Sequence, residues 1–105
     1  MNLPNIIADL AKAQNYFDSL AYANCFSETA IVVDEGKTYQ GKKEIQQWII
    51  KAHENYQPVM NPLDYSAAEE ILKAEVSGNF PGSPIILNYH LKIAEGLIQS
   101  LQITI

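Results

Sequence analysis

Apolar residues recur at helical spacing in two segments of the chain. In the first, Ile6, Leu10, Ala13 and Phe17 follow Pro4, a residue that suits the first turn of a helix. An amphipathic helix is therefore predicted at the start of the chain. A second and clearer helix is predicted from residue 42 to 56, because one stripe there is apolar: Ile45, Trp48, Ile49, Ala52 and Tyr56.

Between these helices the pattern changes to a short helix and two strands. Asp18 is a predicted N-cap for a helix from Ser19 to Phe26. The β-branched run Thr29 to Val33 predicts a strand, and Glu35-Gly36-Lys37 predicts a tight turn. A short strand from Thr38 to Gln40 should follow and end at Gly41.

The C-terminal half alternates between apolar and polar residues, as strands do. After an extended or irregular region at Pro58 and Pro62, three strands are predicted at residues 71–80, 85–93 and 97–105. Both connections are turn-like, so the three strands should form an antiparallel meander. Gly78 would mark a bend or bulge.

The order of elements predicts an α+β fold in which the N-terminal helices pack on a curved, mainly antiparallel sheet. We expect a single domain over residues 1–105. A curved sheet around the long helix would leave a conical cavity between them. In the middle strand of the meander, one face is apolar and should face the core: Leu87, Tyr89, Leu91 and Ile93.

Composition excludes several classes of partner. Seven lysines and no arginine stand against twelve acidic residues, a formal charge of -5, which disfavours binding to nucleic acid or to an anionic membrane surface. One cysteine and two histidines are too few for a disulfide framework or a usual zinc site, and no cofactor is predicted. Without a signal-peptide pattern or a long apolar stretch, a cytoplasmic protein is expected.

Four local strings, taken together, resemble one superfamily over nearly the whole chain. They are DSLAYANCF at 18–26, AIVVDEG at 30–36, YQGKKEI at 39–45 with the following Trp48, and VSGNFPG at 76–82. The chain resembles the nuclear transport factor 2-like superfamily, which includes SnoaL-like cyclases and ketosteroid isomerases. The resemblance implies a cystatin-like, cone-shaped barrel with a pocket at its wide end, commonly dimeric through the outer sheet face. It does not imply one activity, because the fold hosts isomerases, cyclases, dehydratases and binding modules.

The resemblance also implies roles for single residues. Asp34 matches the strand carboxylate that shuttles the proton in isomerase-like members. Their two oxyanion donors, a tyrosine and a protonated carboxyl, correspond to Leu10 and Tyr89, so that pair is not reproduced. The His/Asp pair of dehydratase-like members is not found either, although His53 and His90 are present.

Asp34 and Tyr89 are the candidate catalytic residues, and each has a structural alternative. If Val32 points inward, Asp34 does too, and burial would raise its pKa toward that of a general base. Otherwise Asp34 is a solvated turn acid beside Gly36. The Tyr89 hydroxyl could donate to a bound carbonyl oxygen, or it could be satisfied within the core.

Further apolar and aromatic residues are predicted to line the pocket: Tyr16, Val32, Tyr39, Trp48, Tyr56, Val76, Phe80 and Leu91. For Trp48 a place in the helix core is the better explanation, because it falls on the apolar stripe. His90 falls on the wetter strand face, where exposure or a dimer contact is expected. A cationic His53 would be favourable near the C-terminus of its helix. Cys25 is expected to be a small buried residue.

Two function hypotheses follow. The first is a SnoaL-like pocket protein for a small apolar or polyketide-like molecule, with proton transfer by Asp34 if it is an enzyme. The second is a non-catalytic ligand-binding or dimerisation module. A protein-import adaptor is a third hypothesis, which rests on the fold alone. A homodimer through the outer sheet face is expected in the first two cases.

Overall fold

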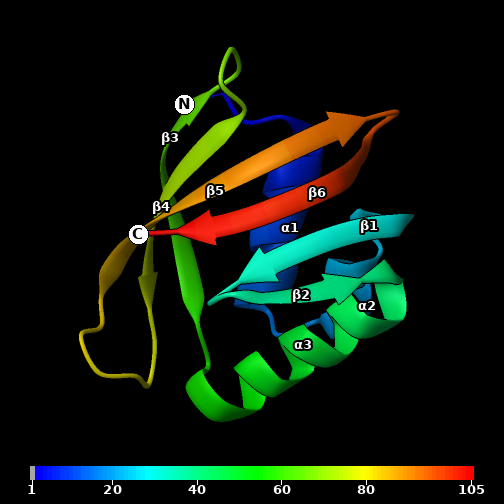
Figure 1. The fold of residues 1–105 in the computed structure, drawn as a ribbon. Coiled ribbons are helices and arrows are strands. Elements are labelled where there is room, and N and C mark those ends of the chain that lie inside the picture. The colour runs from blue at the N-terminus through cyan, green and yellow to red at the C-terminus, as the bar shows by residue number, and fades with distance from the viewer. Residues whose placement is uncertain (1) are drawn as a thin grey trace.

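Three helices cover one side of a six-stranded sheet (Figure 1). The computed structural model describes residues 2–105. The helices are α1 (Asn5–Asn15), α2 (Ser19–Ala23) and α3 (Gly41–Tyr56). The strands are β1 (Phe26–Asp34), β2 (Lys37–Gln40), β3 (Val59–Ser66), β4 (Ile71–Ser77), β5 (Ile85–Ala94) and β6 (Leu97–Thr104). The predicted α+β class, with helices on a curved and mainly antiparallel sheet, is confirmed.

The sheet is unclosed and has the strand order β2-β1-β6-β5-β4-β3. Strands β4, β5 and β6 form the predicted antiparallel meander. The first and last strands, β1 and β6, pair in parallel at the centre of the sheet, and their register shifts between Phe26 and Ile31. This pairing brings the end of β1 beside the meander, although the two are far apart in sequence.

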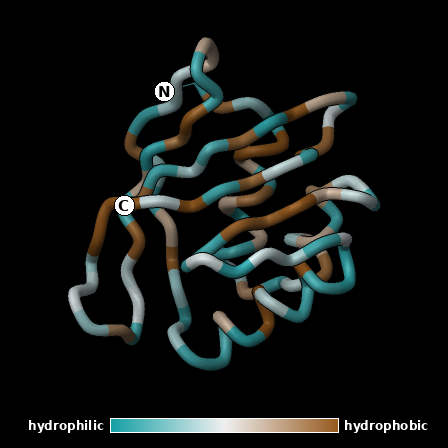
Figure 2. Tube along the Cα trace, viewed as in Figure 1, coloured by the Kyte–Doolittle hydropathy of each residue, from teal (hydrophilic) through white to brown (hydrophobic). Residues whose placement is uncertain are grey.

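The two faces of the sheet differ in what they contact. Every second residue of β4 is buried, including Leu72 and Ala74, and in β5 Tyr89 and Leu91 are buried on the same face. The middle of β1 is apolar on both faces, and Figure 2 draws it as a continuous hydrophobic run. Ala30 and Val32 are fully buried, whereas Ile31 on the opposite face is 38 % exposed. The core therefore lies between the sheet and the helices, as the alternation predicts.

Polar contacts fix the helices against the sheet. Asp18 caps α2 as predicted, because its carboxylate accepts a hydrogen bond of 3.0 Å from the backbone N–H of Ala21. The Asn15 side chain at the end of α1 exchanges two hydrogen bonds with the backbone of Met60 in β3, at 2.8 and 2.9 Å. These contacts join the first helix to the edge strand of the sheet.

Two predictions about element boundaries are wrong. Helix α2 ends at Ala23, and Phe26 instead begins β1 with a fully buried ring. Phe17 lies beyond α1 with a positive φ of 56° and is 44 % exposed. The region around Pro58 and Pro62 was predicted to be extended or irregular, and from Val59 onward it is the extended strand β3. A proline is tolerated there because β3 is an edge strand with a register shift at Pro62.

Gly78 follows β4 and allows two backbone segments to approach closely. A Cβ at this position would lie 2.5 Å from the Tyr56 carbonyl oxygen at the end of α3. The adjacent Asn79 N–H donates to that same carbonyl at 2.6 Å. The glycine thus joins the end of α3 to the β4–β5 connection, rather than bending the strand itself.

Across residues 2–105, none of the helices has both the length and the apolar character that a membrane crossing requires.

Candidate functional site

Five polar or aromatic side chains from five different elements meet in the interior beneath the sheet. They are Gln14 from α1, Tyr22 from α2, Asp34 from β1, Trp48 from α3 and Tyr89 from β5. We call these five residues the inner cluster. The pairing of β1 with β6, and of β6 with β5, places Asp34 and Tyr89 on the same face of the sheet.

Asp34 is the titratable centre of the inner cluster. It is the last residue of β1 and is half-buried, on the same side of the strand as the fully buried Val32. Burial raises the pKa of its carboxyl, and the nearby Glu35 raises it further. Hydrogen bonds from the Trp48 side chain and the Glu35 backbone oppose this rise in pKa. The residue is only partly solvated, and no cation among residues 2–105 forms an ion pair with it.

Tyr89 faces Asp34 from the middle strand. Its side chain is 2 % exposed, and the Gln14 side chain hydrogen-bonds its hydroxyl. Burial is the main reason why the pKa of Tyr89 is raised, and the charge of Asp34 raises it further. The hydroxyl is therefore protonated at neutral pH and can donate a hydrogen bond. Gln14 itself is 4 % exposed and contacts the Pro58 carbonyl oxygen at 3.4 Å.

Tyr22 completes the cluster from the short helix α2. It is fully buried, with its ring centre 6.1 Å from that of Trp48 and 5.6 Å from that of Phe26. Burial, followed by the charges of Tyr89, Cys25 and Asp34, raises its pKa. Its hydroxyl has no hydrogen-bond partner among residues 2–105.

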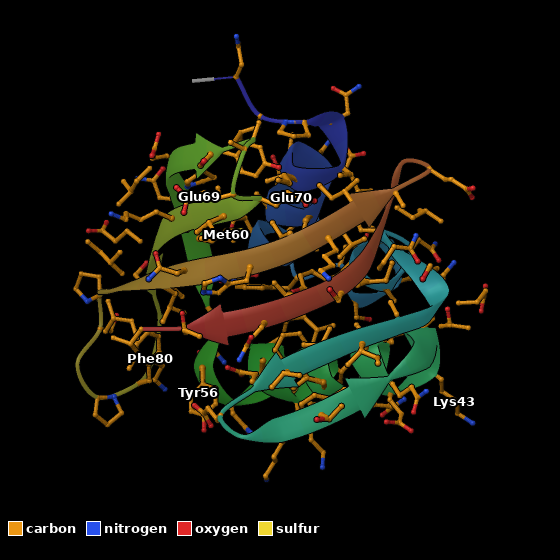
Figure 3. The ribbon with its side chains drawn as sticks, turned by 45° about the horizontal axis from the view of Figure 1, so that its top comes forward. Lys43, Tyr56, Met60, Glu69, Glu70 and Phe80 are labelled. Atoms are coloured by element: carbon orange, nitrogen blue, oxygen red, sulfur yellow. The ribbon has the colours of Figure 1, made fainter. Side chains whose placement is uncertain are left out.

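The residues predicted to line a pocket fall into two groups around the inner cluster. Val32, Val76 and Leu91 are core residues that are at most 4 % exposed. Tyr39 stacks on Trp48 with ring centres 5.6 Å apart. Tyr56 and Phe80 meet edge to face at 6.4 Å, near the end of the molecule where β1 finishes (Figure 3).

Tyr16 is separate from these residues. It is 75 % exposed and lines a surface groove of about 470 Å³ beside α1 and α2, together with Ile6, Asp9, Lys12, Ala13, Asp18, Ala21, Asn24 and Cys25. Because Phe17 leaves the helix with a positive φ, the chain turns here and Tyr16 points to solvent. Tyr16 was predicted to line the pocket, and the structure places it apart from the inner cluster.

The opposite face of the sheet carries a shallow hollow of about 300 Å³. Its lining includes Ile31, Val33, Lys92, Ser100 and Gln102. His90 also lies here, as predicted for the wetter face, with Nε2 2.9 Å from the Thr104 hydroxyl oxygen. This outer face is separated from the inner cluster by the sheet itself.

His53 and Cys25 are both buried. His53 is 9 % exposed, its ring lies 5.1 Å from that of Phe17, and its Nε2 has no partner among residues 2–105. Burial lowers its pKa, so the expectation of a favourable cation at the helix end is wrong. Burial raises the pKa of Cys25 to about 11, which agrees with a buried thiol of low reactivity.

Gln14 and Tyr22 are the cluster residues that the sequence analysis missed. Gln14 lies on the buried stripe of α1, four residues after Leu10, and a polar residue in such a stripe is a detectable signal. Leu10 itself is fully buried core, so Gln14 is the α1 side chain that contacts Tyr89. Tyr22 carried no such signal, because five residues of helix are too short to show which face is buried. Within residues 2–105 no group of three or more His, Cys, Asp or Glu side chains could hold a metal ion.

Comparison with known proteins places this geometry in a family. No protein-family model matches the sequence, and no curated protein matches it. Solved structures do match. A "putative polyketide cyclase" of Sinorhizobium meliloti is 35 % identical, with a TM-score of 0.90, over 97 % of this chain and 95 % of that one.

Two more distant structures share the fold. One is a protein of Catenulispora acidiphila with a ketosteroid isomerase-like fold, in complex with trimethylamine, at 20 % identity and a TM-score of 0.87, covering 99 % of this chain and 87 % of that one. The other is a protein of Mycobacterium tuberculosis in complex with estradiol-17beta-hemisuccinate, at 8 % identity and a TM-score of 0.72, covering 95 % and 90 %.

Helices on a curved sheet, with a polar cluster enclosed between them, define a cystatin-fold protein of the SnoaL-like type. The chain belongs to the nuclear transport factor 2-like superfamily, as the identity to the Sinorhizobium protein shows and the names of further matching structures support. The resemblance found in the sequence is confirmed.

Proposed function

We propose that this protein binds a small apolar or polyketide-like molecule beside the inner cluster and catalyses proton transfer at a carbon next to a carbonyl group. The observation that carries the proposal is the position of Asp34, a half-buried carboxyl whose pKa is raised, at the end of β1. A carboxylate with a raised pKa is a better general base near neutral pH than an ordinary one. The names of the polyketide cyclase-like and ketosteroid isomerase-like structures support the same class of ligand.

In the proposed reaction, Asp34 takes a proton from the α-carbon of the ligand. The C–H electron pair forms a carbon–carbon double bond, and the carbonyl oxygen takes up the negative charge. The Tyr89 hydroxyl donates a hydrogen bond to this oxygen, because its raised pKa keeps it protonated. Asp34 then returns the proton to a carbon of the same ligand, so no cofactor is consumed. The apolar walls would come from Val32, Val76 and Leu91.

The test is deuterium exchange at the α-carbon of 2-tetralone, a compact bicyclic ketone, followed by NMR in D₂O. Wild-type protein is expected to accelerate exchange above the buffer rate, and Asp34→Asn should reduce the acceleration at least about 100-fold, as for loss of a general base. Asp64→Asn makes the same change at an exposed carboxylate on β3 and serves as the matched control. Equal exchange with wild type and Asp34→Asn would contradict the proposal.

A homodimer through the outer sheet face is the second proposal, and it would hold equally for a non-catalytic binding module. Exposed apolar side chains support it: Ile31 is 38 % exposed and Ile86 49 %, and the outer hollow lies on the same face. Both side chains lie on the outer face, and exposed apolar side chains are typical of contact surfaces. We also propose a cytoplasmic location.

Light scattering after gel filtration tests the dimer. The wild type should have twice the mass of one chain, and Ile31→Glu should reduce it to one, because a carboxylate would be buried without a partner at the contact. Leu20→Glu places the same charge on the exposed surface of α2 and should leave the mass unchanged. A monomeric wild type would rule out this surface as a homodimer contact.

A further inference from the structure

The surface groove beside α1 and α2 lies on the helical side of the molecule, and the proposed proton transfer does not use it. The groove has a volume of about 470 Å³, and Ala13 and Ala21 are among the residues that line it. The next residue in each helix, Gln14 and Tyr22, belongs to the inner cluster. The two helices therefore separate this groove from the candidate active site.

Small side chains form the floor of the groove, and larger apolar side chains are exposed beside it. Ala13 and Cys25 are each 4 % exposed, whereas Tyr16 in the same lining is 75 % exposed. Phe17 and Leu20, two further exposed apolar side chains, follow Tyr16 within four residues of sequence. An exposed apolar patch next to a recess is typical of a site for a partner.

The charges around the groove are mainly negative. Asp9 and Asp18 line it together with one lysine, Lys12, and none of the three forms an ion pair among residues 2–105. The charge of Asp9 raises the pKa of the Cys25 thiol, after the larger effect of burial, so the negative potential reaches the floor. Asp18 accepts the Ala21 N–H with one carboxylate oxygen, which leaves its second oxygen for a partner. A cation in the groove would therefore meet carboxylates from both helices.

These charges select among the macromolecules that could cover the groove. A second copy of this chain would bring two further carboxylates and only one further ammonium group to the contact, and each chain has a formal charge of -5. A nucleic acid or an anionic membrane would be repelled in the same way. A basic segment of another protein matches the carboxylates, and its apolar side chains match the exposed rings.

We propose that this groove binds a basic amphipathic helix of another protein, with a Lys or Arg side chain between Asp9 and Asp18 and apolar side chains against Tyr16 and Leu20. The space between two helices accepts a third helix, whose side chains fill the groove. An amphipathic helix presents apolar and cationic side chains side by side, as this surface requires. The interaction goes beyond the proposed function and is compatible with an enzyme or with a binding module.

A synthetic peptide tests the groove directly. The probe is a helix of about 18 residues made of Leu and Lys at amphipathic spacing, added to the ¹⁵N-labelled full chain. It should shift amide resonances of α1 and α2, and its affinity should fall as the salt concentration rises, because exposed charges are screened. A peptide with Glu in place of every Lys should not bind. A peptide of the same Leu/Lys composition without an apolar face should bind more weakly.

Variants of the groove show which side chains carry the binding. Asp9→Asn combined with Asp18→Asn should weaken Leu/Lys peptide binding about three- to tenfold, since each exposed charge pair contributes modestly. Asn is as good an N-cap as Asp, so Asp18→Asn preserves α2. Glu75→Gln combined with Glu95→Gln removes the same charge from exposed positions of β4 and the β5–β6 turn, and is the matched control. Tyr16→Ser should weaken binding about tenfold, because an aromatic anchor is lost.

Three results would overturn the inference. They are equal peptide affinities of the two double variants, amide shifts confined to the sheet, and equal binding of the Glu peptide. A wild-type dimer that becomes monomeric in Tyr16→Ser, measured by light scattering without peptide, would also overturn it by showing that a second copy fills the groove. Asp9→Asn combined with Asp18→Asn should exchange 2-tetralone as fast as the wild type, so this inference and the proposed function can fail separately.

Discussion

The two faces of the central strands carry different chemistry on neighbouring residues. In β5, Tyr89 points into the interior and the adjacent His90 points to the outer hollow. In β1, Asp34 lies on the inner side and Val33 on the outer side. The inner polar groups have few partners and perturbed pKa values, whereas His90 bonds a neighbouring hydroxyl. We therefore expect proton transfer at the inner face of the sheet and the contact between two chains at its outer face.

The largest expected difference between the two faces is in packing. Phe26→Ala should lower the free energy of unfolding by about 3–5 kcal/mol, because it removes a fully buried ring and leaves a cavity beside Tyr22. Ile86→Ala on the outer face, where the side chain is 49 % exposed, should cost about 1 kcal/mol or less. Urea unfolding of both variants measures this, and equal losses would remove the distinction between the faces.

A smaller effect concerns His53 and pH. Its pKa in the folded protein lies below the ordinary 6.5, so near that pH the unfolded chain binds more protons than the folded one. The stability of the wild type should therefore fall by roughly 0.5–1 kcal/mol as the pH drops through and below this value. His53→Leu should lose that dependence in urea titrations at pH 7.5 and 5.5. An unchanged pH dependence in the variant would show that another group is responsible.

The smallest effect has the opposite sign and belongs to Asp34. Its pKa in the folded protein is raised above the ordinary value of 3.8. Between that ordinary pKa and the raised pKa of the folded protein, the folded state therefore binds more protons than the unfolded chain. Stability should fall as the pH rises through that window. Because the group is partly exposed, Asp34→Asn should stabilise the protein at neutral pH by only about 0.5–1 kcal/mol. If Asp34→Asn were less stable than the wild type at neutral pH, the raised pKa of the Asp34 carboxyl would be contradicted.

Local patterns were enough to predict most of the fold. The stripe of α3, the Asp18 cap and the alternation of β5 are each set by residues close in sequence, and all three are confirmed. Strand β3 was missed because its prolines oppose a central strand, and only its edge position makes them acceptable.

The inner cluster was predictable only in part. Asp34 is two residues after Val32 in β1, so the two side chains were predicted to share the inner side of the strand. The alternation of apolar and polar residues in β5 predicted the inner side for Tyr89. The position of Tyr22 depends on how α2 packs against α1 and α3, which no local pattern encodes. The distance of Tyr16 from the inner cluster was not predictable, because the helical spacing does not reveal the turn at Phe17.

A ¹³C NMR titration of the Asp34 carboxyl tests the central claim most directly, with the same chain unfolded in urea as its reference. The account predicts a midpoint for the folded protein above that of the unfolded chain, and a further rise in Trp48→Phe, since that change removes a hydrogen bond that lowers the pKa. A midpoint at or below the unfolded value would show that Asp34 is a solvated turn acid, and the proposed base would be lost.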